Sequence, residues 1–178
     1  MTSVLVACVG NIFKSDDGFG VEVAAVLARR ELPDEVRLVD FGIRSVHLVY
    51  ELLAGYDVLV LVDTVAQQEG PPGSLYLIEP NIPAASYDED PLPEVMLDAH
   101  DLSPGGVMAL VPTLGGQVDR ILVVGVQPLT LDDGIGLSEP VRAAVGPAAD
   151  MVARTVDREL GRLLRAGAAS SAQREVER

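Results

Sequence analysis

The sequence is short of positive charge. Its 178 residues contain 13 Lys and Arg against 27 Asp and Glu, so the formal net charge is -14. Proteins that bind DNA or RNA, or that attach to anionic membranes, need a surface rich in Lys and Arg, which this chain cannot easily supply. We therefore expect neither a nucleic-acid partner nor a membrane partner.

Cysteine, long apolar runs and aromatic side chains are also scarce. Cysteine occurs once, as Cys8, which excludes an internal disulfide framework and is typical of the reducing cytoplasm. No apolar run reaches the roughly 18 residues of a membrane-spanning helix, and no basic segment precedes the first apolar run. We therefore expect a cytoplasmic protein without a signal peptide. With 4% aromatic residues and no Trp, its core must consist of Val, Leu, Ala and Ile.

Strand patterns and helix patterns alternate along the chain. The expected strands are residues 3–9, 36–39, 57–63, 74–79 and 120–126. Helical spacing occurs at residues 19–30, 45–53 and 103–114, and again after Ser138, with Pro147 opening the longer part. This alternation predicts an α/β fold of three layers (α/β/α, phosphorylase/hydrolase-like), with a twisted, mostly parallel central sheet. We assign residues 1–165 to one domain and expect residues 166–178 to form a disordered tail.

The turn after the first expected strand reads GNIFKSDDGFG, residues 10–20. A glycine-bearing turn in this position often binds a phosphate at a helix N-terminus. The dinucleotide fingerprint G-x-G-x-x-G lacks two of its three glycines here, although Asp40 supplies the acidic residue expected further on. Asp16 and Asp17 would also repel a pyrophosphate. The sequence thus disfavours a nucleotide cofactor and leaves open what the two aspartates do.

Helix capping explains one of these two aspartates. Asp is a preferred N-cap residue, and an acidic side chain in the first turn complements the helix dipole. Asp16 is the natural candidate for the cap, which leaves Asp17 without a structural role. The pattern D-D-G-x-G returns at residues 132–136, before the last expected helix. One of the two copies could serve only as the transition from a loop into a helix.

Acidic residues end two of the expected strands. Asp63 follows the run VLVLV, and Asp40 ends the shorter strand before it. Each could simply begin a turn, but sites in α/β folds form at the carboxyl ends of strands, and Asp63 ends the more apolar strand. His100 follows a long acidic, proline-rich segment that could fold over this edge. Asp17, Asp63 and His100 would then form an oxygen and nitrogen ligand set suited to a divalent metal with open positions.

Other catalytic patterns are absent or weak. The motifs G-x-S-x-G and H-E-x-x-H do not occur, and neither does a phosphate-binding P-loop. Cys8 lies within an expected strand, where a structural thiol is the simpler interpretation. His47 lies in a short expected helix, where a surface role is the simpler interpretation. The residues by themselves predict a carboxylate-rich pocket at the carboxyl edge of a sheet.

A series of spaced motifs runs through most of the chain. Residues 10–20 read G-N-x-x-x-x-D-D-G-x-G, an apolar strand ends in Asp63, and a Pro-Gly turn leads into a strand at residues 72–75. His100 follows, and residues 124–138 contain V-G-V-x-P-x-x-L and then G-L-S. In this order and spacing, over roughly residues 3–160, the chain resembles the maturation endopeptidases of nickel–iron hydrogenases.

The resemblance implies a peptidase with one α/β domain. Such an enzyme removes the C-terminal extension of a nickel–iron hydrogenase large subunit after nickel insertion, so the immature large subunit is the implied partner. The family's catalytic and metal-contacting residues match Asp17, Asp63 and His100. Nickel is carried by the substrate, and no permanently bound cofactor is implied, although Ni, Zn or Cd could occupy the site. Gly18 and Gly20 would let a metal-bearing peptide approach the backbone.

One loop departs from the family pattern. After the second expected strand the family usually has Asp-Gly-Gly-Thr, whereas this chain has Asp40-Phe41-Gly42-Ile43-Arg44. The bulky Phe41 and the cationic Arg44 change the substrate contacts expected of this loop. Two other classes of function stay open: a non-catalytic checkpoint protein that binds the immature large subunit through the same pocket, and a nucleotide-binding α/β domain.

Overall fold

The computed structural model describes residues 3–65, 68–80 and 116–176. The strands are β1 (Val4–Val9), β2 (Val36–Gly42), β3 (Tyr56–Thr64), β4 (Leu75–Ile78) and β5 (Val118–Val126). The helical segments are η1 (Ser15–Gly18, a 3-10 turn), α1 (Phe19–Leu27), α2 (Ser45–Leu52) and α4 (Glu139–Val176). All the expected strands are present, with ends that differ by a few residues. The helix expected at residues 103–114 lies outside the described residues.

The strands form one sheet in the order β2-β1-β3-β5-β4. Neighbouring strands are parallel except β4, which pairs antiparallel with β5. From β1 the chain forms β2 on one side and then crosses to form β3 on the other side. The connections that follow β1 and β3 therefore diverge, which makes the carboxyl ends of these two neighbours the topological switch point of the sheet, where sites in α/β folds form.

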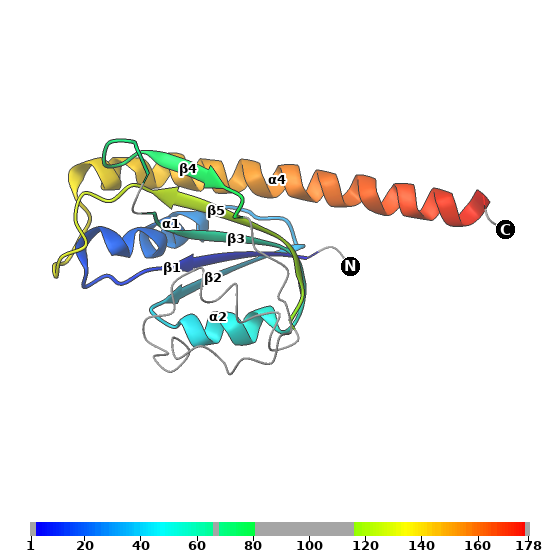
Figure 1. Cartoon of the computed structure of the whole chain (residues 1–178), viewed down its shortest axis with the longest axis horizontal. Helices are drawn as coiled ribbons and strands as arrows, with labels where there is room; N and C mark the ends of the chain where they lie inside the picture. Colours follow the sequence, from blue (N-terminus) through cyan, green and yellow to red (C-terminus); the bar gives the residue numbers. More distant parts are fainter. Residues whose placement is uncertain (1–2, 66–67, 81–115, 177–178) are drawn as a thin grey trace.

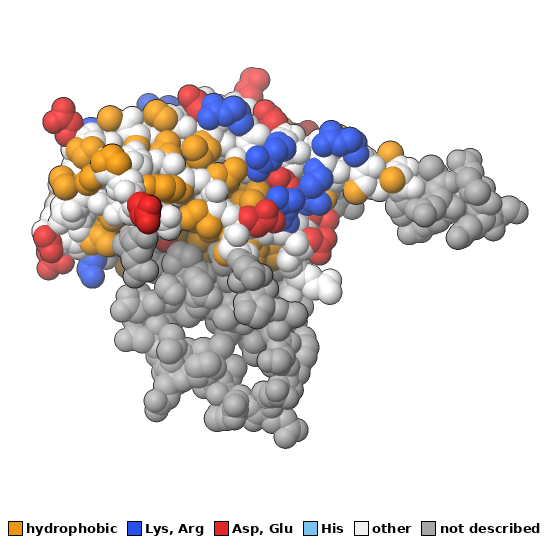
Figure 2. All heavy atoms as spheres, turned by 45° about the horizontal axis from the view of Figure 1, so that its top comes forward, with side chains coloured by type: hydrophobic (Ala, Val, Ile, Leu, Met, Phe, Trp, Pro, Cys, Tyr) orange, Lys and Arg blue, Asp and Glu red, His pale blue; other side chains and the backbone are white. Residues whose placement is uncertain are grey.

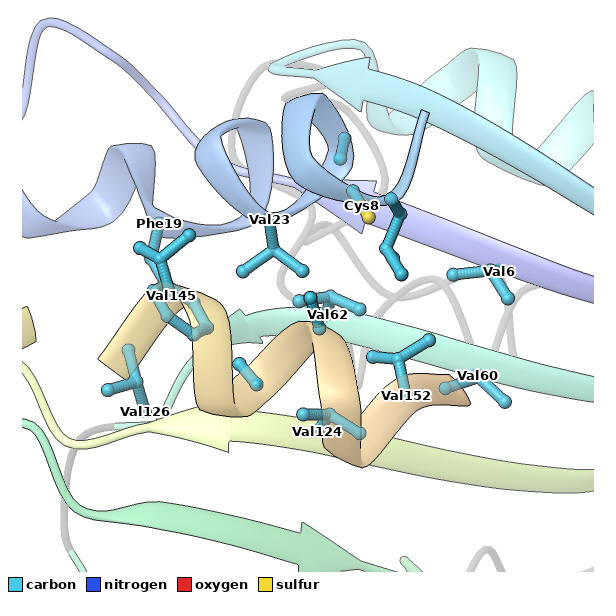
Figure 3. Close-up of a cluster of buried hydrophobic side chains, with 14 of the residues drawn as sticks. Val6, Cys8, Phe19, Val23, Val60, Val62, Val124, Val126, Val145 and Val152 are labelled. Atoms are coloured by element: carbon cyan, nitrogen blue, oxygen red, sulfur yellow. The ribbon is translucent and has the colours of Figure 1, made fainter. Parts of the chain in front are cut away.

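Helices cover both faces of the sheet (Figure 1). Side chains alternate along a strand, so Val6 and Cys8 of β1 pack towards α1 and α4, whereas Leu5 and Ala7 pack towards α2. Figure 3 shows the cluster on the α1 and α4 side, which is built mainly from valines. Branched aliphatic side chains thus fill the core in place of aromatic ones. These features confirm the predicted three-layer α/β fold with a mostly parallel central sheet.

One carboxylate of α4 is buried where the helix packs against the sheet. Val156 of α4 is a buried core residue, and Glu159, one turn further along the same helix, is also only 1% exposed. Its carboxylate oxygens lie 2.8 Å from Arg162 Nε, 3.3 Å from Arg158 Nε and 3.6 Å from Arg120 Nε of β5. Burial works to raise the pKa of Glu159, yet the arginines hold it below its ordinary value. This ion cluster joins α4 to β5, at the end of the sheet opposite the carboxyl edge.

Helix α4 is longer than the sequence predicts. It includes Pro147 and continues to Val176, past the boundary at residue 165 after which we expected a disordered tail. The structure instead gives residues 166–176 helical backbone, and Ala, the strongest helix former, occurs four times in this segment. The assignment of residues 1–165 to one domain stays a prediction. Among the described residues, no helix is both long and apolar enough to cross a lipid bilayer.

Gly20, near the start of α1, lets this helix approach the sheet. A Cβ atom at Gly20 would lie 2.0 Å from the carbonyl oxygen of Val9 and 2.7 Å from that of Val62, on β1 and β3. Gly10 has a φ of +149°, and a Cβ there would lie 2.0 Å from the carbonyl oxygen of Asp17. Close packing of the backbone therefore explains why glycine occupies positions 10 and 20. The approach of a substrate peptide is not required to explain Gly20.

Replacing Gly20 by alanine should destabilise the fold, because the added methyl group overlaps two carbonyl groups of the sheet. We expect the free energy of unfolding, measured by urea denaturation, to fall by about 1–3 kcal/mol. Gly167 of α4 is the matched control, since a Cβ there would meet nothing within 4 Å. Gly167→Ala should leave the free energy unchanged or raise it by up to about 1 kcal/mol. Equal losses in the two variants would contradict the packing role of Gly20.

Candidate functional site

Two carboxylates lie near each other at the carboxyl ends of β1 and β3, close enough for the charge of one to act on the other. Asp17 lies in η1, after the turn that follows β1, and Asp63 is the last residue but one of β3. Because β1 and β3 are parallel neighbours, both residues lie at the carboxyl edge of the sheet, at its topological switch point. The structure thus brings together two of the three residues that the sequence analysis assigned to a site.

Asp17 is oriented by two neighbouring residues. The Asn11 N–H donates to Oδ2 of Asp17 at 2.9 Å, and the Thr64 hydroxyl lies 3.4 Å from Oδ1. The side chain of Asn11 in turn accepts a hydrogen bond from the Phe13 N–H at 2.9 Å, which shapes the turn. Asp17 is half-buried, so its carboxylate is fixed in place and still accessible. No sequence pattern distinguishes Thr64 as a site residue, and Asn11 is visible in the sequence only as the second residue of the G-N-x-x-x-x-D-D-G-x-G motif.

Asp63 is more deeply buried than Asp17. It is 8% exposed, and the Thr64 N–H donates to its Oδ1 at 2.7 Å. Burial raises the pKa of Asp63 to about 7, and the charge of Asp17 also raises it, against the lowering effect of the Thr64 hydrogen bond. At neutral pH Asp63 therefore populates both of its protonation states. A carboxyl group of this kind is suited to general acid–base catalysis.

Asp16 makes contacts quite different from those of Asp17. It is fully buried, and its carboxylate accepts hydrogen bonds from the N–H groups of Leu129 (2.8 Å), Thr130 (3.1 Å) and Ser138 (2.6 Å) and from the Ser138 hydroxyl (2.9 Å). Burial works to raise the pKa of Asp16, but these hydrogen bonds hold it below its ordinary value.

The prediction that Asp16 caps the first helix is wrong. Gly18 occupies the N-cap position of α1, and no side chain caps that helix. The partners of Asp16 belong instead to the loop between β5 and α4, where Ser138 directly precedes α4. The negative charge of Asp16 thus lies at the N-terminus of α4, where the dipole of that helix stabilises it. Sequence spacing could not reveal this, because more than 110 residues separate Asp16 from each partner.

The two D-D-G-x-G segments lie side by side. Lys14 and Gly134 form a parallel bridge, in which Gly134 accepts from the Ser15 N–H and donates to the carbonyl oxygen of Phe13, both at 2.9 Å. The Ser15 hydroxyl also donates to the carbonyl oxygen of Asp132 at 3.0 Å. The second segment therefore supports the first one, which is a contact that the repeated pattern alone did not predict.

The other residues considered from the sequence are not part of the Asp17 and Asp63 pair in the described part of the chain. His100 lies outside the described residues, and within the described ranges no three His, Cys, Asp or Glu side chains form a metal-binding group. Asp40 is exposed and accepts a hydrogen bond from the Gly42 N–H at 2.9 Å, as a turn residue does. His47 is exposed on α2. Cys8 is buried, and burial together with the charge of Asp40 raises the pKa of its thiol, which fits a structural role.

The loop that departs from the family pattern is stabilised from within. Phe41 is buried in the core cluster on the α2 side, together with Leu48. The guanidinium group of Arg44 donates to the carbonyl oxygens of Phe41 at 3.1 Å and Asp40 at 2.9 Å. Both unusual residues therefore hold the turn between β2 and α2, while Ile43 between them is exposed.

The Asp63 carboxyl group should titrate near pH 7 in the metal-free protein, as measured by NMR of the carboxyl carbons. Asp17→Asn removes a negative charge, so the pKa of Asp63 should fall but stay above its ordinary value, because burial persists. Asp133→Asn, an exposed aspartate of the second D-D-G-x-G segment, should leave it unchanged. An Asp63 pKa of about 4, the ordinary value, would contradict this description of the site.

Comparisons with known proteins agree on one family. A family model described as hydrogenase maturation protease matches residues 21–155. The hydrogenase expression/formation protein HupM of Azotobacter chroococcum mcd 1 is 34% identical over 152 residues, which is 82% of this chain and 68% of HupM. The hydrogenase 2 maturation protease of Escherichia coli (strain K12) is 29% identical over 151 residues, which is 84% of this chain and 87% of that protein.

A solved structure gives the same result. The hydrogenase maturating endopeptidase HybD from E. coli superposes with a TM-score of 0.69 at 27% identity, over 89% of this chain and 94% of HybD. The family match covers well over half of the chain and begins at residue 21, directly after the opening turn that carries Asp17. The chain belongs to the hydrogenase maturation protease family and is, like its relatives, an endopeptidase.

Proposed function

We propose that this endopeptidase removes the C-terminal extension of a nickel–iron hydrogenase large subunit after nickel has been inserted. Membership of the family supports a maturation role. The observation that carries the choice of site is the pairing of Asp17 and Asp63 at the switch point, where one carboxylate is oriented and the other is buried.

The two carboxylates have different parts in this proposal. Asp17, held by Asn11 and Thr64, presents an oxygen ligand to the nickel-loaded region of the substrate. Asp63 accepts a proton from the attacking water, which its pKa of about 7 favours at neutral pH. His100 is proposed as the third member of the set, from its match to the family motif. Carboxylate and imidazole ligands suit a borderline divalent ion such as nickel.

Nickel enters this proposal as part of the substrate, and we propose no permanently bound cofactor. The partner is the immature large subunit. We also propose a cytoplasmic location, which the single Cys8 supports because extracellular proteins of this size often carry disulfides.

Asp17→Asn and Asp63→Asn should each abolish or strongly slow processing while the fold persists. Loss of general acid–base catalysis alone reduces rates by about 100-fold to 10,000-fold. The test is to co-express each variant with a candidate large subunit and to weigh the C-terminus of that subunit by mass spectrometry. Asp133→Asn, at the equivalent position of the second D-D-G-x-G segment, should process normally.

Normal trimming by both site variants would contradict the assignment of Asp17 and Asp63. A stable complex between the wild-type protein and an untrimmed, nickel-loaded large subunit would instead favour the checkpoint role, in which the same pocket binds the precursor without cutting it.

A further inference from the structure

Six exposed, large apolar side chains lie on three loops at the carboxyl edge of the sheet. They are Ile12, Phe13, Ile43, Leu129, Leu131 and Ile135, here termed the apolar edge patch. The described residues contain only four other side chains of this kind, spread over α2 and its C-terminal end, β4 and α4: Tyr50, Leu53, Leu77 and Leu164. In Figure 2 hydrophobic side chains gather at the left end of the molecule, where Figure 1 places the ends of β1 and β5.

Two of these loops hold each other in place. The Lys14–Gly134 bridge and the hydrogen bond from the Gly134 N–H to Phe13 fix the turn after β1 against the loop after β5. The buried Asp16 carboxylate, which accepts from the Leu129 N–H, ties them a second time. Phe13 and Ile135 are therefore exposed on a fixed backbone, at 63% and 85%. Large apolar side chains that are exposed to solvent on ordered loops are typical of a surface that binds a partner.

The patch adjoins the candidate site. Asn11, whose N–H orients Asp17, is followed directly by Ile12 and Phe13. On the other side of the turn, Gly10 donates to the carbonyl oxygen of Gly42, which precedes the exposed Ile43. Apolar side chains therefore lie on the same turns that hold the site.

We propose that the apolar edge patch docks an apolar segment of the protein substrate beside the bond to be cut. This inference rests on the proposed function and names the surface that this function uses. The chemistry of the patch selects an apolar segment, because aliphatic and aromatic groups form the buried centre of protein interfaces. The net charge of -14 acts in the same direction, since it disfavours a strongly acidic segment.

Binding of purified, nickel-loaded, immature large subunit tests the proposal without requiring cleavage. Phe13→Ser combined with Ile135→Ser should weaken binding at least tenfold and raise KM, with little change in kcat. Phe13→Leu, which keeps an apolar group, should bind better than Phe13→Ser. Tyr50→Ser and Leu164→Ser are the matched controls, since their side chains are 66% and 68% exposed but lie on α2 and α4.

Unchanged affinity of the double variant, or an equal loss in the controls, would overturn the proposal. So would light scattering that finds the wild-type protein dimeric and the double variant monomeric, because a second copy would then occupy the patch. A wild-type protein that binds the precursor through Phe13 and Ile135 but never trims it would refute the proposed function and leave the docking surface standing.

Discussion

The arrangement of the site depends on one buried carboxylate. Asp16 accepts hydrogen bonds from Leu129, Thr130 and Ser138, and so joins the turn after β1 to the loop that leads into α4. A buried carboxylate is tolerable only with several donors and a favourable dipole, and the N-terminus of α4 supplies both. The turn at residues 10–20 therefore depends for its conformation on hydrogen bonds to residues 129–138, which are far away in the sequence.

This constraint separates the functions of two adjacent aspartates. Because Asp16 has a structural role, Asp17 is the aspartate of this pair that stays partly accessible, with its carboxylate held by Asn11 and Thr64 beside Asp63. The switch point between β1 and β3 brings the two side chains together, and burial gives Asp63 a pKa of about 7. The same loops carry the apolar edge patch, so the surface proposed for docking and the carboxylates proposed for chemistry share one support.

Local patterns in the sequence were enough to predict the layers of the fold and the position of Asp63. Apolar runs mark buried parallel strands, and the carboxyl edge follows from their direction. The contacts of Asp16, the pairing of Glu159 with Arg120 and the meeting of the two D-D-G-x-G segments were not predicted. Each joins residues far apart in the chain, which no local period or spacing records. His100 lies outside the described residues, so its place in the set stays a prediction.

The central claim is that Asp16 is structural and Asp17 is chemical, and urea unfolding of two variants tests it most directly. Asp16→Asn leaves buried donors facing a neutral amide, so the free energy of unfolding should fall by about 2–4 kcal/mol. Asp17→Asn should change it by less than about 1 kcal/mol, because that carboxylate is partly accessible and has few partners. Equal losses in the two variants, or an Asp16→Asn variant as stable as the wild type, would contradict the account.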